Sequence, residues 1–379
     1  MGQKKTIELP PRRPDGALNG IEVAKLKGKL GTRQLPTAEL LLDGCEAVRV
    51  SPVGRGISSI SNMLTVTRFH NAVMSVAAMR KVTFLARDYA QRRRAFGRPL
   101  CDHVLHGQTL ARMEAETRGC LALVLDLARQ MGREDCGTIG EEDSLLLRLM
   151  TPVAKMYTAK AAVAVSSEGL ECFGGQGYIE ETGLPGILRD AQVLPIWEGT
   201  SNVMSLDVLR SAAKSGGAVM DALGARVERA CAKGKGSTDA VVARAAAEVE
   251  AAAAAIAQFL LRNPQLTEVG ARDLTVSLSF ILLFQWPLMN DIHLMTSTYP
   301  PQGHPPLSMT LMPFSGEPRA HLHRRPPAGA LPARHGGGWG PLHSPALARA
   351  GSRTGGHKLC PRILRGRRRF VQVLCARGL

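Results

Sequence analysis

Three long stretches of apolar residues at helical spacing limit the fold of this chain more than any other feature. The stretches are 57–94, 101–131 and 141–173. Each is closed by helix breakers, namely Arg98-Pro99, Gly132 and Gly174-Gly175. Apolar residues three or four positions apart predict amphipathic helices. After a tight loop, shorter helices are predicted over 200–213, 218–233 and 238–261. Long helices joined by short connections imply an antiparallel helical bundle, so we expect a mainly α fold.

The first 55 residues have a different character. Ile21–Lys25 and Ala38–Asp43 have the composition of short strands, and Gly28, Gly31 and Pro36 separate them. Two strands leave both edges and one face uncovered, so they do not form a stable sheet alone. We therefore expect residues 1–55 to be a small β segment that depends on other parts of a protein.

The positive charge of the chain is concentrated at its C-terminal end. The formal net charge is +16, and residues 281–379 hold 13 Lys and Arg against two acidic residues. This tail is rich in Pro and Gly and has no apolar period, so we expect disorder. Since the rest of the chain is only mildly basic, the overall charge does not identify a nucleic-acid-binding protein. The run Arg367–Arg369 could be a targeting signal or a nucleic-acid-binding patch, but chance in a tail of unusual composition explains it better.

Cysteine and apolar patterns exclude two further classes. None of the eight cysteines forms a Cys-x-x-Cys pair or lies near a histidine cluster, so we predict no metal site and reduced thiols. No run reaches the ~18 uninterrupted apolar residues of a membrane span. The prediction is a protein without metal or membrane segment.

Glu198 is the strongest candidate for a catalytic residue. Trp197 precedes it and can exclude water, while Gly199 follows and lets backbone pass close to another molecule. Thr200, together with Ser201 and Asn202, starts the next predicted helix. A carboxylate beside an apolar wall is a stronger base, which suits removal of a proton from carbon. The alternative is an ordinary first-turn glutamate that the helix dipole favours.

Four separated segments occur in an informative order. They are 89–97 (YAQRRRAFG), 171–178 (ECFGGQGY), Arg189-Asp190 and 197–200 (WEGT). In this order and spacing they resemble the C-terminal half of the acyl-CoA dehydrogenase family, in its AidB-like branch. The resemblance implies that 1–55 is a remnant of the middle β domain, 56–262 the helical bundle domain, 263–280 the end of a family-like helix, and 281–379 a divergent tail. The N-terminal helices and most of the β domain of the family have no counterpart.

The resemblance also implies a reaction. Glu198 would remove the α-proton of an acyl-CoA thioester, its own N–H would bind the thioester oxygen, and FAD would accept the β-hydride. Other family branches carry the base one residue before Arg68, but Thr67 occupies that position and cannot serve. Residues implied near the substrate are Arg68, Trp197, Gly199 and Arg210. Arg68 and Arg210 could equally be surface arginines.

Residues implied near FAD are Arg93, Phe96, Glu171, Gly174, Gly175, Thr200 and Asn202. Arg93 and Phe96 would reach the flavin of a neighbouring subunit, and a guanidinium suits its diphosphate. Glu171 departs from the family, in which many members have Gln, because a carboxylate repels a diphosphate. The interpretation requires Glu198 to face a cleft near the glycine pair and Arg93.

The resemblance further implies a homodimer or homotetramer, an electron-transferring flavoprotein as redox partner, and a mitochondrial location. Because half of the family's site is missing from the matched part, this chain alone is expected to lack useful turnover. Two other functions remain open. The bundle could be a non-catalytic oligomerisation or regulatory module, or the protein could be a nucleic-acid-associated flavoprotein of the AidB type.

Overall fold

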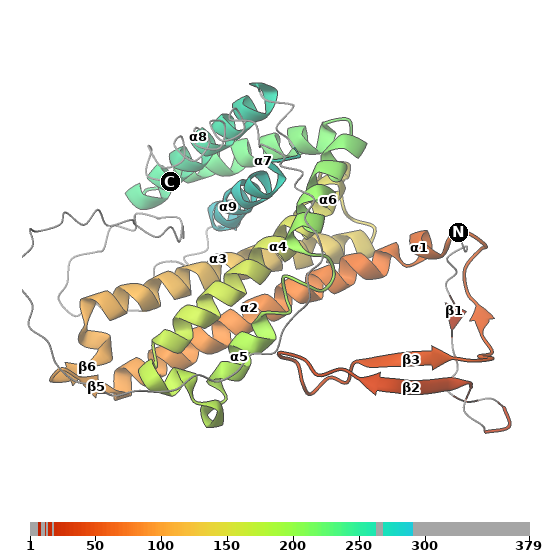
Figure 1. The fold of residues 1–379 in the computed structure, drawn as a ribbon. Coiled ribbons are helices and arrows are strands. Elements are labelled where there is room, and N and C mark those ends of the chain that lie inside the picture. Colours follow the sequence, from red (N-terminus) through yellow and green to blue (C-terminus); the bar gives the residue numbers. More distant parts are fainter. Residues whose placement is uncertain (1–6, 9–11, 13, 17–18, 263–267, 291–379) are drawn as a thin grey trace, which may run out of the picture. The chain divides into compact units, whose positions relative to one another are not determined.

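Helices form most of the described chain (Figure 1). The computed structural model describes residues 7–8, 12, 14–16, 19–262 and 268–290. The predicted mainly α fold is confirmed. The helices are α1 Gly56–Ser59, α2 Ser61–Arg92, α3 Val104–Asp135, α4 Glu141–Glu171, α5 Leu184–Ala191, α6 Ser201–Lys214, α7 Ala218–Lys235, α8 Ala240–Arg262 and α9 Ala271–Asn290. Three short 3-10 turns are η1 Leu100–Asp102, η2 Gly174–Tyr178 and η3 Glu180–Thr182. The strands are β1 Ile7–Glu8, β2 Ile21–Leu26, β3 Ala38–Leu42, β4 Val48–Arg49, β5 Arg94–Ala95 and β6 Arg98–Pro99.

The centre of the bundle is formed by α2, α3 and α4, and α4 also contacts α5, α6 and α7. Buried residues of α2 recur every three or four positions, a spacing that keeps them on one face of a helix. They are Ala72, Val76, Met79, Thr83, Ala86 and Ala90. Small side chains at several of these positions let the neighbouring helices approach this face of α2 closely.

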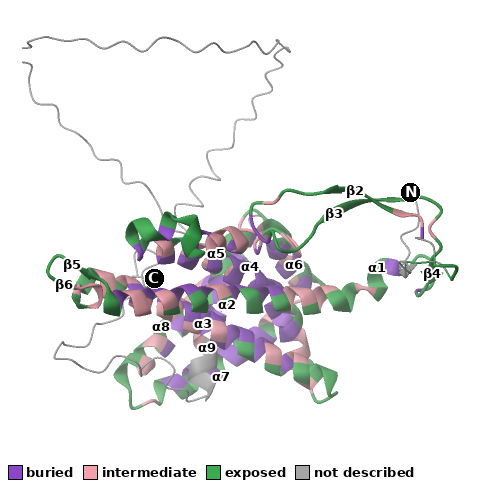
Figure 2. Cartoon of the chain, turned by 90° about the horizontal axis from the view of Figure 1, so that it is seen from below, coloured by how far each residue is buried: buried purple, intermediate pink, exposed green. Residues whose placement is uncertain are grey.

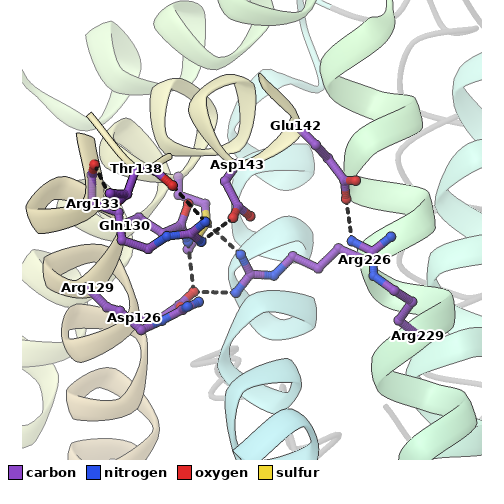
Figure 3. Close-up of polar contacts among 10 residues, drawn as sticks. Asp126, Arg129, Gln130, Arg133, Thr138, Glu142, Asp143, Arg226 and Arg229 are labelled. Atoms are coloured by element: carbon purple, nitrogen blue, oxygen red, sulfur yellow. Dashed lines mark hydrogen bonds and ion pairs between the residues drawn. The ribbon is translucent and has the colours of Figure 1, made fainter. Parts of the chain in front are cut away.

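A buried ion pair attaches α7 to α3 (Figure 3). The side chains of Arg226 and Asp126 are 3% and 2% exposed. Arg129 and Gln130 donate hydrogen bonds of 2.9 and 3.0 Å to the same carboxylate. Removing one partner of such a pair leaves an uncompensated buried charge, which costs about 3–5 kcal/mol. The pair therefore joins α7 to α3, in addition to the packing of α7 against α4, α8 and α9.

Two helices differ from the predictions. The sequence predicts a loop between Gly175 and Thr200, but α5 forms within it and starts after Gly183, whose φ is +73°. The helix has eight residues, too few for a clear period. Helix α9 continues to Asn290, past the predicted boundary at residue 280. The predicted tail lies outside the described residues from 291 onward. No helix within 19–262 or 268–290 is long and apolar enough to cross a membrane.

The two predicted strands are present as β2 and β3, which pair antiparallel with Ile21 opposite Leu42. Their apolar side chains are mostly exposed (Figure 2). Those more than half exposed are Val23, Leu26, Leu40, Leu41 and Leu42. A hairpin with so much exposed apolar surface agrees with the expectation of a segment that needs a covering partner. Its origin in a larger β domain stays a prediction.

The chain between β2 and β3 is attached to α5. The N–H of Thr32 donates a 2.6 Å hydrogen bond to Asp190 Oδ1. A Cβ on Gly31 would lie 2.3 Å from the carbonyl oxygen of Arg189, so only glycine fits there. Arg189 and Asp190, which the sequence marks as one of the four segments, therefore hold this connection against the bundle.

Candidate active site

Glu198 lies in a turn between α5 and α6 where two successive residues have left-handed backbone angles. The φ angle is +58° at Glu198 and +104° at Gly199. The backbone angle of Gly199 is one that residues with a Cβ rarely adopt, so the conformation favours glycine there. A non-glycine residue in the left-handed region costs about 1–2 kcal/mol. Surrounding contacts must therefore hold Glu198 in this conformation.

Thr67 of α2 provides one of these contacts. Its Oγ1 donates a 2.7 Å hydrogen bond to Oε2 of Glu198, and Glu198 is half-buried rather than turned outward into solvent. Thr67 occupies the alternative base position of the family that the sequence resembles. The fold thus brings both base positions to one point, and Glu198 is the residue of the two that carries a carboxylate.

Lys155 of α4 provides a second contact, and the sequence did not predict it. The side chain is fully buried, and its Nζ donates a 2.5 Å hydrogen bond to the carbonyl oxygen of Gly199. Burial and then repulsion from Arg68 lower the pKa of Lys155 from 10.5 to about 8, against an opposing attraction to Glu198. A hydrogen bond from a charged donor contributes about 1.5–3 kcal/mol, enough to offset the cost of the left-handed turn. Inside an apolar run, one lysine carries no sequence signal.

Asp207 forms ion pairs with three arginines near the turn that contains Glu198. Arg68, Arg148 and Arg210 come from α2, α4 and α6, with N–O distances of 2.8, 2.8 and 2.9 Å to its carboxylate. Burial would raise the pKa of Asp207, but hydrogen bonds and charge from Arg148 and Arg68 outweigh burial and lower it. One carboxylate cannot neutralise three guanidinium groups, so the cluster keeps a positive charge. It is suited to an anionic ligand, although Arg68 and Arg210 also have a structural role.

A second group of predicted residues begins where α2 ends. Arg93 follows the last residue of α2 and is exposed. Phe96 and Gly97 form the two-residue turn between β5 and β6, with φ angles of +51° and +83°. Phe96 is 95% exposed, so its ring offers an aromatic face to solvent at this end of α2.

The glycine pair lies at the corresponding end of α4. Gly174 has φ +58°, and no atom lies within 4 Å of the position that a Cβ on Gly174 or Gly175 would occupy. The backbone is therefore open to an approaching molecule. The rings of Tyr89 and Phe173 are 4.9 Å apart between centroids, which joins the ends of α2 and α4. The exposed carboxylate of Glu171 belongs to the same end.

These two groups of residues do not meet within one chain. Thr67 lies near the start of α2 and Arg93 directly after its end. At a rise of 1.5 Å per residue they are about 35–40 Å apart. The requirement that Glu198 face a cleft near the glycine pair and Arg93 therefore fails inside a single chain. The cause is the length of α2, which separates Thr67 at one end from Arg93 at the other. The order of the motifs along the sequence does not reveal this distance.

Comparisons with known proteins identify the domain. Residues 54–213 match the family model described as acyl-CoA dehydrogenase, C-terminal domain. This segment is similar to acyl-CoA dehydrogenase C-terminal domains. Acyl-CoA dehydrogenase family member 11 of Caenorhabditis elegans is 56% identical over 202 residues, 53% of this chain and 33% of that protein. Escherichia coli AidB is 37% identical over 209 residues, covering 55% and 38%. The resemblance that the sequence indicates is confirmed.

Solved structures agree with this identification. The crystal structure of Caenorhabditis elegans ACDH-11 in complex with C11-CoA has a TM-score of 0.72 and 42% identity, covering 77% of this chain and 51% of that chain. An acyl-CoA dehydrogenase complexed with FAD from Bacillus anthracis has a TM-score of 0.57 and 20% identity, which establishes the fold alone. The chain thus spans about half the length of these structures, and a third to two fifths of the curated relatives.

The matched segment brings together only part of the predicted site. Thr200 is the N-cap residue of α6 and Asn202 lies in its first turn, both exposed and close in sequence to Glu198. Trp197 packs partly against the bundle core. Thr67, Lys155, Arg148 and Asp207 were not predicted to contribute. Only Thr67 carried a signal, because the resemblance implies a base at this position in other branches of the family.

Proposed function

We propose that this chain serves in flavin-dependent α,β-dehydrogenation of an acyl-CoA thioester, with Glu198 as the base. The hydrogen bond between Thr67 and Glu198 carries the proposal, because it joins two positions 131 residues apart that both hold bases in the family. The relationship to ACDH-11, crystallised with C11-CoA, supports acyl-CoA as the substrate class. The cationic cluster around Asp207 supports an anionic ligand such as coenzyme A.

The residues of the turn fit the first step. The Thr67 hydroxyl donates its hydrogen bond to Oε2 of Glu198, so Oε1 would be the oxygen that takes the α-proton. The electron pair of the broken C–H bond would move into the enolate. The N–H of Glu198 has no backbone acceptor among the described residues, so it is available to bind the thioester oxygen, where negative charge develops.

The residues at the far end of α2 fit FAD. Gly174 and Gly175 leave space beside the backbone, and the exposed side chains of Arg93 and Phe96 offer a charged and an aromatic contact. Bound FAD would supply the acceptor for the β-hydride, since no amino-acid side chain accepts hydride. Glu171 adds an exposed negative charge at this end, which argues that the diphosphate would approach from the side of Arg93.

An oligomer follows from the separation of the two groups. Because about 35–40 Å lie between Thr67 and Arg93, the flavin-side residues of one chain would serve a site whose Glu198 belongs to another chain. The exposure of Phe96, and of Tyr178 at 88%, supports an assembly that covers this end. A homodimer or homotetramer is therefore part of the proposal, as is electron transfer to a partner flavoprotein.

Two measurements test the proposal. The purified chain is incubated with FAD, passed through a desalting column and examined for flavin absorbance. Exchange of the α-protons of a saturated acyl-CoA in D2O, followed by NMR, tests the base directly, because exchange requires no hydride acceptor. Glu198→Gln should abolish exchange, whereas Glu181→Gln, an exposed glutamate in η3, should not. Absence of α-proton exchange in the wild type would refute the enzymatic function, whether or not the chain retains flavin.

A second function is favoured by the exposed apolar residues themselves. The hairpin β2–β3, Phe96 and Tyr178 would suit a module that assembles with complete dehydrogenase subunits without catalysing the reaction. Co-expression of this chain with a full-length relative tests this function. Co-purification without proton exchange would support the module, and separate elution of the two chains would reject it.

A further inference from the structure

Lys155 is a buried cation to which the proposed function gives no task. It lies within α4, is fully buried, and holds the carbonyl oxygen of Gly199 at 2.5 Å. The charged groups that act on it are Arg68 from α2 and Glu198 from the turn. Charged side chains are almost never fully buried unless they are paired or hydrogen-bonded. The hydrogen bond from Nζ to the carbonyl oxygen of Gly199 therefore explains why Lys155 is buried at this position.

We infer that Lys155 is a positioning residue for Glu198, an inference that rests on the function proposed above. The carbonyl that it holds belongs to the residue directly after Glu198, and both residues have left-handed backbone angles. Thr67 fixes the carboxylate of Glu198 from α2, while Lys155 fixes the following backbone from α4. The base is thus held at its side chain and at its backbone by two different helices.

A purely structural lysine and a positioning lysine predict different results. Loss of a structural residue changes the stability of the protein but leaves the rate per folded molecule unchanged. Loss of a positioning residue lowers the rate while the affinity for acyl-CoA stays nearly constant, because the binding surface is intact. A displacement of ~1 Å in a reacting group can lower a rate on the order of 100-fold.

The test compares Lys155→Met, which removes the donor and keeps the length, with Lys155→Gln, which keeps an N–H donor without the charge. Lys160→Met is the matched control, since Lys160 is an exposed lysine on the same helix. We expect Lys155→Met to slow α-proton exchange ~100-fold at saturating octanoyl-CoA and to change its Kd less than about threefold. Lys155→Gln should recover part of the rate of α-proton exchange. If Lys155→Met does not fold, the rate of Lys155→Gln is compared with that of the wild type instead.

The outcomes separate this inference from the proposed function. Exchange by Lys155→Met at the wild-type rate, with Glu198→Gln inactive, overturns the positioning role alone. Absence of exchange in the wild type overturns the proposed function instead. In that case the inference is tested by backbone amide hydrogen exchange of peptides covering 196–201. Faster amide exchange in Lys155→Met than in Lys160→Met supports the inference that Lys155 stabilises the turn, and equal amide exchange overturns the inference.

Discussion

Raising the pH from 8 to 10.5 should stabilise this protein by about 3 kcal/mol through Lys155 alone. Burial, then Arg68, lowers the pKa of this lysine from 10.5 to about 8 in the folded state. Between these values the unfolded chain binds more protons than the folded chain, so the free energy of unfolding rises with pH. Below pH 8 the cost of burying the charge is fully present, and above 10.5 it is gone. Each pKa unit corresponds to 1.36 kcal/mol, which gives the stated magnitude.

Urea unfolding followed by far-UV circular dichroism, at pH values from 7.5 to 10.5, measures this change. Other groups titrate in the same range, so the informative quantity is the difference between the wild type and Lys155→Met at each pH. We expect this difference to change by about 3 kcal/mol across the window, while the difference between the wild type and Lys160→Met stays flat. Parallel curves for all three proteins would refute the assignment of a buried, charged lysine at this position.

Three further changes have defined outcomes. Arg226→Met should destabilise the protein by about 3 kcal/mol in urea unfolding, because the buried carboxylate of Asp126 loses its buried partner and keeps only Arg129 and Gln130. Arg229→Met, in an exposed pair, should cost less than about 1 kcal/mol, and equal losses would contradict this. Thr67→Val should slow proton exchange about tenfold by removing the donor to the base, equivalent to about 1.4 kcal/mol. Phe96→Ala should leave the melting temperature unchanged yet lower flavin retention and the oligomer mass in size-exclusion chromatography; unchanged elution and absorbance would contradict its proposed contact.

The helices could be predicted because their ends are marked chemically. Gly132 and Gly174 lie just inside or just past helix ends, and the apolar spacing between such residues is regular over 30 residues or more. Helix α5 could not be predicted in this way, because eight residues contain only two turns. Its start depends on the left-handed Gly183, whose conformation becomes clear only in the folded chain.

The candidate site could be predicted only in part, for a physical reason. Motifs report which residues a reaction needs, but they do not report distances across a fold. Thr67 and Glu198 are 131 residues apart in sequence and in hydrogen-bond contact, whereas Thr67 and Arg93 share one helix and lie far apart. Lys155 has no motif of its own, because its role depends on a backbone carbonyl that any residue could provide.

The length of α2 has a consequence for mixtures of variants. If each chain lends its two ends to two different sites, a Glu198→Gln chain paired with a Phe96→Ala chain would form one doubly defective centre and one in which both contributions are wild type. Two impaired proteins would then recover dehydrogenation when refolded together. Such complementation would show that α2 keeps the two groups of residues far apart in one chain, so that each active centre depends on two neighbouring subunits.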